Sequence, residues 1–270
     1  MRHRYHKSFT AQLGLAWMLA KRDLKNRYAS SYAGIAWNIG VPLLYSIINV
    51  LVFSILMSGK MGADYGNVPF AMFYFVPLSL WTVFAEVVGR SPSVLREYSY
   101  LINKIAFPTW VLPLIPMASA LLSQAVILTM TIALAIHLHV PIASTAWMYI
   151  VIWMITLVIT MGVAYAVSSL AVYVPDMVQA VPVGITIMFW LTPILYPATL
   201  VRDKGAVWLR NIIMDYNPFY YVVDTSRHAV FGSAEVHLQT LGLMAVVALL
   251  ILAAGVSIFR KLQPGFADVI

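Results

Sequence analysis

The sequence predicts an all-α integral membrane protein with six transmembrane helices. Of its 270 residues, 61% are hydrophobic and only 10% are charged, whereas a soluble domain carries roughly 25% charged residues. Long apolar runs recur along the chain, and each approaches the roughly 20 residues that a spanning helix needs. There is no cysteine, so the fold cannot depend on a disulfide framework.

Residues 1–34 are expected to form a cytoplasmic basic arm followed by an amphipathic helix. Between Ser8 and Tyr28, hydrophobic residues such as Trp17 and Ala20 recur at helical spacing among basic ones. This pattern is typical of a helix that lies in the membrane interface, although an ordinary surface helix would show it too. Because the first apolar run begins only at about Ile35, we expect no cleavable signal peptide.

Residues 35–260 are expected to form the transmembrane domain, followed by a cytoplasmic tail at 261–270. Most of the 17 Lys and Arg fall on one side of the membrane if the N-terminus is inside, so the positive-inside rule places both termini in the cytoplasm. The positive-inside rule thus explains the net charge of +7, and we expect no nucleic-acid partner. The six predicted spans are Ile35 to Met57, Phe70 to Val88, Phe107 to His137, Ala146 to Tyr173, Met177 to Tyr196 and Leu238 to Phe259.

Two of the connections between spans are themselves expected to be helical. The inner segment from Ser91 to Pro108 has a helical pattern, which predicts a short helix at the cytoplasmic surface capped by Ser91 or Ser93. The outer segment 203–232 contains Asn217-Pro218, an N-cap followed by proline at the first helical position. We expect two short helices on either side of this dipeptide, at about 206–216 and 218–231. Neither is long enough to span the membrane, so we expect them to form a re-entrant hairpin. A pair lying flat outside the membrane is the alternative.

The sequence lacks the motifs of a catalytic site. It contains no phosphate-binding loop, no zinc-protease motif and no nucleophile elbow. We therefore expect no catalytic residue, no metal and no cofactor on this chain. Glu86 and Arg90, four residues apart near the inner end of the second span, could pair. Ionisable residues deep in the spans are scarce, which argues against a proton-coupled transporter.

Aromatic residues are frequent in the predicted spans. An aromatic face can stack on the C–H face of a sugar whichever sugar passes, so these side chains would suit a pore for a long glycan. Interfacial aromatic belts would place several of the same residues near the membrane surfaces. The candidate channel residues are Tyr45, Phe73, Tyr74, Trp81, Phe84, Trp190 and Tyr196.

Five stretches resemble one family of membrane proteins over nearly the whole chain and in the same order. They are Arg22 to Tyr45, Tyr100 to Leu114, Leu191 to Pro197, Asn217 to Gly232 and Phe259 to Ile270. The sequence resembles the permease subunits of ABC-2 type polysaccharide exporters, in particular the O-antigen and teichoic acid branch.

The resemblance implies a division of labour between subunits. Two copies of the permease would form a homodimeric channel in the bacterial inner membrane for a lipid-linked polysaccharide. Two ATP-binding-cassette ATPase subunits would bind the ATP and Mg. A coupling helix at about 93–103 would dock into each ATPase, with Val174 to Gln179 as a smaller contact. The expected coupling residues are Arg96, Glu97, Tyr98, Leu101, Asn103 and Lys104.

The basic residues of the amphipathic helix would lie near the headgroup of the lipid carrier. Arg22, Lys25 and Arg27 are the candidates for attracting its pyrophosphate. Plain anchoring to anionic lipid explains the same charges equally well.

Other cargoes and one other class of protein remain open from the sequence, whereas the amphipathic cytoplasmic helices disfavour an ungated channel. An ABC-2 exporter of capsule, of teichoic acid or of a small amphiphile or drug would have the same fold. A membrane-embedded enzyme acting on lipid-linked sugars needs paired acidic residues near the inner face. The acidic residues nearest that face are isolated from one another in sequence: Asp23, Glu86, Glu97 and Asp176.

Overall fold

The computed structural model describes residues 9–27, 36–56, 65, 68–104 and 107–270, and every regular element in these ranges is a helix. The α-helices are α1 (Phe9–Arg27), α2 (Ala36–Leu56), α3 (Phe70–Glu97), α4 (Ser99–Lys104), α5 (Ile115–His137), α6 (Met148–Tyr173), α7 (Met177–Leu191), α8 (Ala198–Lys204), α9 (Val207–Arg210), α10 (Pro218–Phe231), α11 (Leu238–Leu262) and α12 (Phe266–Val269). The 3-10 segments are η1 (Thr109–Leu114), η2 (Ser144–Trp147) and η4 (Gln263–Gly265), and η3 (Asn211–Asp215) is a π-helix.

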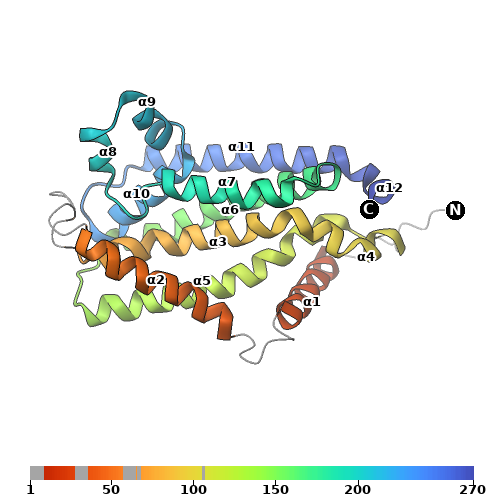
Figure 1. Cartoon of the computed structure of the whole chain (residues 1–270), viewed down its shortest axis with the longest axis horizontal. Coiled ribbons are helices and arrows are strands. Elements are labelled where there is room, and N and C mark those ends of the chain that lie inside the picture. Colours follow the sequence, from red (N-terminus) through yellow and green to blue (C-terminus); the bar gives the residue numbers. More distant parts are fainter. Residues whose placement is uncertain (1–8, 28–35, 57–64, 66–67, 105–106) are drawn as a thin grey trace.

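The long helices run side by side along the long axis of the molecule (Figure 1). Helix α3 packs against α5, α6, α7 and α10, and α6 packs most extensively against α11. Helices α8, α9 and α10 gather at one end, here called the hairpin end, and α1, α4 and α12 lie at the opposite end, here called the α4 end (Figure 1).

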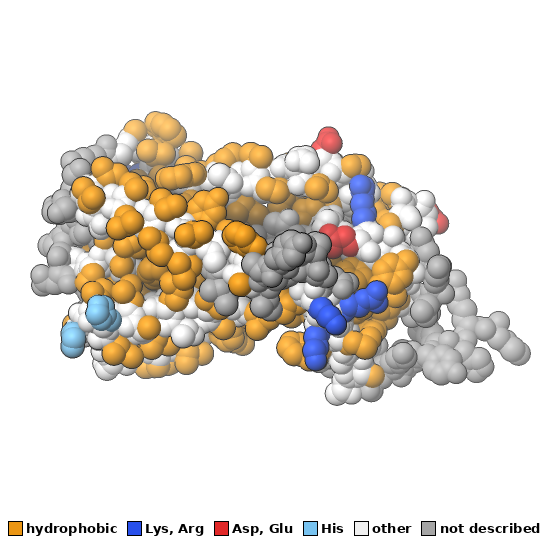
Figure 2. Space-filling view, turned by 60° about the horizontal axis from the view of Figure 1, so that its bottom comes forward, with side chains coloured by type: hydrophobic (Ala, Val, Ile, Leu, Met, Phe, Trp, Pro, Cys, Tyr) orange, Lys and Arg blue, Asp and Glu red, His pale blue; other side chains and the backbone are white. Residues whose placement is uncertain are grey.

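Four of the described helical segments are long and apolar enough to cross a membrane. They cover Phe70–Glu97, Thr109–His137, Ser144–Tyr173 and Leu238–Val269, and two shorter apolar helices cover Leu43–Leu56 and Met177–Leu191. On the face in Figure 2, hydrophobic side chains cover most of the surface, while the Lys, Arg, Asp and Glu side chains gather toward one end. The chain is a multi-pass membrane protein, and the predicted count of six spans stays a prediction.

The predicted coupling segment differs in the structure from the separate capped helix that the sequence suggested. Helix α3 continues beyond Val88 to Glu97, and the break falls at Tyr98, before α4 begins. Ser91 caps no new helix, because its hydroxyl donates back to the Val87 carbonyl at 2.7 Å. Ser93 bonds in the same way to the Arg90 carbonyl at 3.2 Å. Segment 93–103 is therefore divided between the last turn of α3 and α4.

Two glycines allow α6 and α11 to pack backbone against backbone. A Cβ on Gly255 would overlap the carbonyl oxygen of Gly162, and a Cβ on Gly162 would lie 2.7 Å from the backbone of Ile251. Small residues at such a crossing let membrane helices approach closely.

We expect Gly255→Ala to separate these helices and to lower the free energy of unfolding by about 2 kcal/mol, as overpacking does. Thermal unfolding of the purified protein in detergent measures this. Gly242→Ala is the control on the same helix, because a Cβ there meets no atom within 4 Å. Equal stabilities for the two variants would contradict the close crossing.

Candidate functional site

An ion pair ties the amphipathic helix α1 to the bundle at the α4 end. Arg90 on α3 donates from Nη1 and Nη2 to the two carboxylate oxygens of Asp23 on α1, each at 2.8 Å. Ser119 on α5 completes the cluster, 3.3 Å from Arg90 Nη1 and 3.4 Å from Asp23 Oδ2. The side chains of Arg90 and Asp23 are only 21% and 11% exposed, so three helices meet at a largely buried, two-point ion pair.

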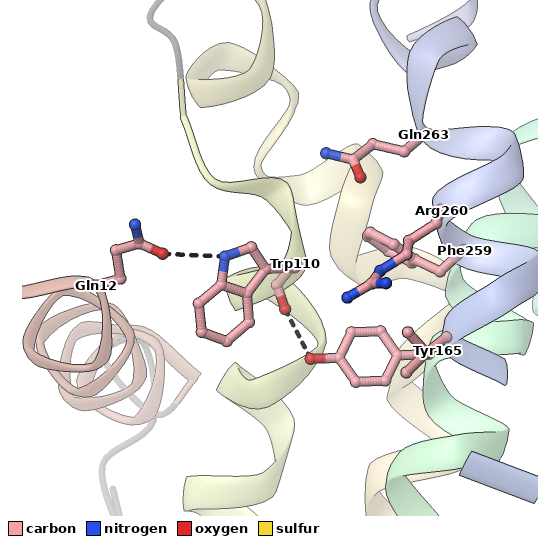
Figure 3. A pocket seen from close by; sticks show the side chains of 7 residues that line it. Gln12, Trp110, Tyr165, Phe259, Arg260 and Gln263 are labelled. Carbon is pink, nitrogen blue, oxygen red and sulfur yellow. Dashed lines mark hydrogen bonds between the residues drawn. The ribbon is translucent and has the colours of Figure 1, made fainter. Parts of the chain in front are cut away.

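A second tether connects α1 to α6 through the side chain and the backbone carbonyl of Trp110. Trp110 Nε1 donates to Gln12 Oε1 on α1 at 3.1 Å, and the Trp110 carbonyl accepts from the Tyr165 hydroxyl on α6 at 2.9 Å (Figure 3). These residues line a cavity of about 420 Å³ together with Phe259 and Arg260 at the end of α11. Helix α1 is thus held at two places, one against α3 and α5 and one beside α11.

The face of α1 that packs against the rest of the chain includes only part of the stripe that the spacing suggested. Ala16, Leu19 and Ala20 are buried, whereas Trp17 is 67% exposed. Of the predicted headgroup cations, Arg22 and Lys25 are exposed, and the side chain of Arg27 lies outside the described residues.

The predicted coupling residues at the α4 end fall into two groups. Arg96 and Glu97 are exposed: Arg96 Nη2 donates to the Val172 carbonyl at 3.1 Å, and Glu97 accepts from Ser93 at 2.5 Å. Tyr98 is buried and Leu101 is partly buried in a hydrophobic cluster that also contains residues of α1, α6 and α11. The side chains of Asn103 and Lys104 lie outside the described residues.

The environment of Tyr98 keeps its phenol uncharged. Burial, with smaller effects of the carboxylates of Asp23 and Glu97, raises the pKa of Tyr98 to about 12. Tyr98 therefore acts as a packing residue, whereas its neighbour Tyr100 on α4 is 43% exposed and available to a partner.

At the hairpin end, a buried arginine joins α10 to α3 and to the turn after α7. Arg227 is 1% exposed and donates to the carbonyls of Phe73 at 3.0 Å, Pro193 at 2.7 Å and Ile194 at 2.7 Å. Its guanidinium also lies 3.4 Å from the centre of the Phe73 ring. The Phe73 carbonyl needs this donor because Pro77, one helical turn later, has no N–H to offer it.

The candidate channel aromatics also divide into two groups. Four are buried within the single chain: Phe73, Tyr74, Trp81 and Phe84. The ring of Phe84 packs on Phe219 of α10 with the centroids 4.3 Å apart. Tyr45 on α2 and Trp190 on α7 are 67% and 55% exposed, and the half-buried Tyr196 donates its hydroxyl to the Trp190 carbonyl at 3.0 Å. Tyr45 and Trp190 are therefore the members of the set that present a large surface outside the single chain.

The described residues contain no group of three His, Cys, Asp or Glu that could hold a metal ion. At the α4 end, both carboxylate oxygens of Asp23 accept from Arg90, and one of them also accepts from Ser119. The geometry of the described residues supports mechanical linkage between helices. Its main polar contacts are the Asp23–Arg90 pair at the α4 end and Arg227 at the hairpin end.

Comparison with known proteins identifies the relatives of this chain. The chain is 29% identical to the O-antigen export system permease protein RfbA of Myxococcus xanthus, over 94% of this chain and 95% of that protein. It is 27% identical to the protein of the same name from Klebsiella pneumoniae, over 94% and 93%, and 20% identical to the polysialic acid transport protein KpsM of Escherichia coli, over 88% and 90%. The permease names agree with the prediction of a non-catalytic subunit. The model of the ABC-2 type transporter family matches residues 14–231, and the chain belongs to this family.

Proposed function

We propose that this protein is the membrane-spanning subunit of an ABC exporter that moves a lipid-linked polysaccharide, O-antigen-like, across the bacterial inner membrane. The observation that carries the proposal is the similarity, over more than nine-tenths of the chain, to permeases named for O-antigen export. The lower similarity to a polysialic acid transport protein favours capsule as the second candidate cargo. Teichoic acid and small amphiphiles are further alternatives with the same fold.

The transmembrane part of this subunit comprises six helices, with α2 and α7 added to the four long apolar segments. Both α2 and α7 are apolar and carry many exposed hydrophobic side chains. No residue of α7 is buried within the described chain. A second copy of the chain, packed across α2 and α7, would cover these surfaces and form a homodimeric channel. Tyr45, Trp190 and Tyr196 then lie nearest to its lumen.

Energy comes from two ATPase subunits that bind ATP and Mg and dock at the α4 end, on the cytoplasmic side with both termini. The last turn of α3 and α4 act as the coupling element, and its exposed residues Arg96, Glu97 and Tyr100 contact the ATPase. The short connection between α6 and α7 adds a smaller contact. The hairpin end, α8 to α10, covers the exit on the opposite side. On α1, Arg22, Lys25 and Arg27 attract the pyrophosphate of the lipid carrier.

Deletion of this gene tests the function directly. We expect polysaccharide to disappear from the cell surface and lipid-linked polymer to accumulate inside the cell, as measured by immunoblotting of intact and permeabilised cells. The wild-type gene restores surface display. A deletion strain with normal surface polysaccharide and no internal polymer would overturn the proposal.

The coupling assignment has its own test. We expect Tyr100→Ala to weaken ATPase binding about tenfold, the equivalent of about 1.4 kcal/mol, as the loss of an aromatic hot spot at an interface does. Co-purification and ATPase titration measure this. Tyr216→Ala is the matched control, because Tyr216 is 78% exposed at the hairpin end. Equal ATPase binding by both variants would show that α4 is not the docking element.

A further inference from the structure

We propose that the cavity between α1, η1, α6 and α11 is a binding site for one anionic glycerophospholipid of the surrounding membrane. The cavity measures about 420 Å³. Its lining combines three aromatic side chains with two amides and one guanidinium: Trp110, Tyr165, Phe259, Gln12, Gln263 and Arg260.

The cation at this cavity has no partner within the part of the chain that the structure describes. Arg260 makes no hydrogen bond or ion pair to another described residue. Figure 3 shows its side chain and that of Gln263 reaching from the end of α11 toward Trp110, across the space above Tyr165. A guanidinium beside an apolar floor attracts a phosphate, which it can bind through two parallel hydrogen bonds.

The position of the cavity along α11 fits a lipid headgroup. Helix α11 is apolar over most of its length and carries Arg260 and Lys261 in its last turn, as a span does where it reaches the headgroup layer. Large side chains of α11, such as Leu243 and Leu250, are exposed and face the bilayer in a membrane protein. A lipid can therefore place its phosphate at Arg260 and lay its acyl chain along Val256 and Phe259 without leaving the bilayer.

The floor of the cavity is already fixed before a lipid binds. Trp110 is held by Gln12 on one side and by Tyr165 on the other, and the rings of Tyr165 and Phe259 pack edge to face, with centroids 5.3 Å apart. A lipid bound here contacts α1 and α11 at once. It therefore strengthens the second tether of α1, independently of the exposed cations Arg22 and Lys25.

Native mass spectrometry of the delipidated, purified exporter complex tests the site with phosphatidylglycerol as the probe. We expect one tightly bound phosphatidylglycerol per permease chain. Arg260→Gln weakens it about fivefold, the equivalent of about 1 kcal/mol for a cation at the headgroup layer. Lys261→Gln is the matched control, since Lys261 is the adjacent basic residue, is exposed and does not line the cavity. We expect Lys261→Gln to bind phosphatidylglycerol within twofold of the wild-type affinity.

Val256→Trp provides a second variant that keeps every charge and fills the cavity. We expect it to abolish tight binding while thermal unfolding in zwitterionic detergent stays as in the wild type. Equal weakening by Arg260→Gln and Lys261→Gln would reveal diffuse surface attraction and overturn the site. If Val256→Trp bound phosphatidylglycerol as tightly as the wild type, the lipid would bind outside this cavity. If glycerol phosphate bound as tightly as phosphatidylglycerol, the ligand of the cavity would be a soluble anion and the lipid proposal would be wrong.

Discussion

Arg227→Met should destabilise the hairpin end more than any other single substitution considered for this protein. The change removes three hydrogen bonds to carbonyls of Phe73, Pro193 and Ile194. With about 1 kcal/mol for each carbonyl left unpaired, we expect the free energy of unfolding to fall by about 3 kcal/mol. Thermal unfolding in detergent measures this loss, and export should fall with it because the hairpin is no longer held against α3.

A substitution in α3 can distinguish the loss of the Arg227 hydrogen bond to the Phe73 carbonyl from a non-specific loss of stability. Pro77→Ala gives the Phe73 carbonyl its own helical donor, so the double variant Pro77→Ala, Arg227→Met should lose less stability than Arg227→Met alone. Arg210→Met is the control for removing an exposed cation from the same end and should change little. Equal losses with and without Pro77→Ala would show that Arg227 does not serve this carbonyl.

The position of the hairpin can be followed directly in the same variants. The chain has no cysteine, so Ala229→Cys introduces a single thiol, at a buried position of α10. If Arg227 fixes the hairpin, maleimide labelling of this buried thiol should accelerate in the Arg227→Met background and stay slow in the Arg210→Met background.

Local signals predicted the helices well. The Asn217-Pro218 start of α10 is confirmed: Asn217 Oδ1 accepts from the Phe219 N–H at 3.0 Å. The predicted spans from Met177 and Leu238 begin where α7 and α11 begin. These features depend on neighbours in sequence, namely cap chemistry and runs of apolar residues. The one clear error, a capped helix at Ser91, arose because a serine hydroxyl can equally well bond backwards inside a continuing helix.

The polar contacts between helices were not predictable in the same way. For Arg90 the sequence offered Glu86, four residues away, but its two-point partner is Asp23, 67 residues away on another helix. Arg227 finds the Phe73 carbonyl 154 residues away. One signal was present in each case: Asp23 is the only acidic residue of the basic helix α1, and Arg227 is the only Lys or Arg of the mostly apolar helix α10.

Asp23→Asn should separate the movement of α1 from that of α3. Arg90 lies seven residues before Glu97 on one continuous helix, about two turns from the coupling end. If an ATPase docks at that end, as proposed, a force applied there would reach α1 through the Arg90–Asp23 pair. We expect Asp23→Asn to lower the free energy of unfolding by about 1–2 kcal/mol, the range for a charged hydrogen-bonded pair that is partly buried. Export per ATP hydrolysed should fall several-fold while ATP hydrolysis continues.

The charge-reversed pair distinguishes this linkage from loss of fold. Asp23→Arg alone should inactivate export, because two guanidinium groups then face each other beside Ser119, whereas Asp23→Arg with Arg90→Asp should recover part of it by restoring opposite charges. Lys21→Gln, an exposed position on the same helix, controls for altered charge on α1. Export and ATPase activity measured together in proteoliposomes decide the matter. If export and hydrolysis fall in proportion in Asp23→Asn, the pair anchors α1 without transmitting motion, since a transmitting contact must change the ratio of the two.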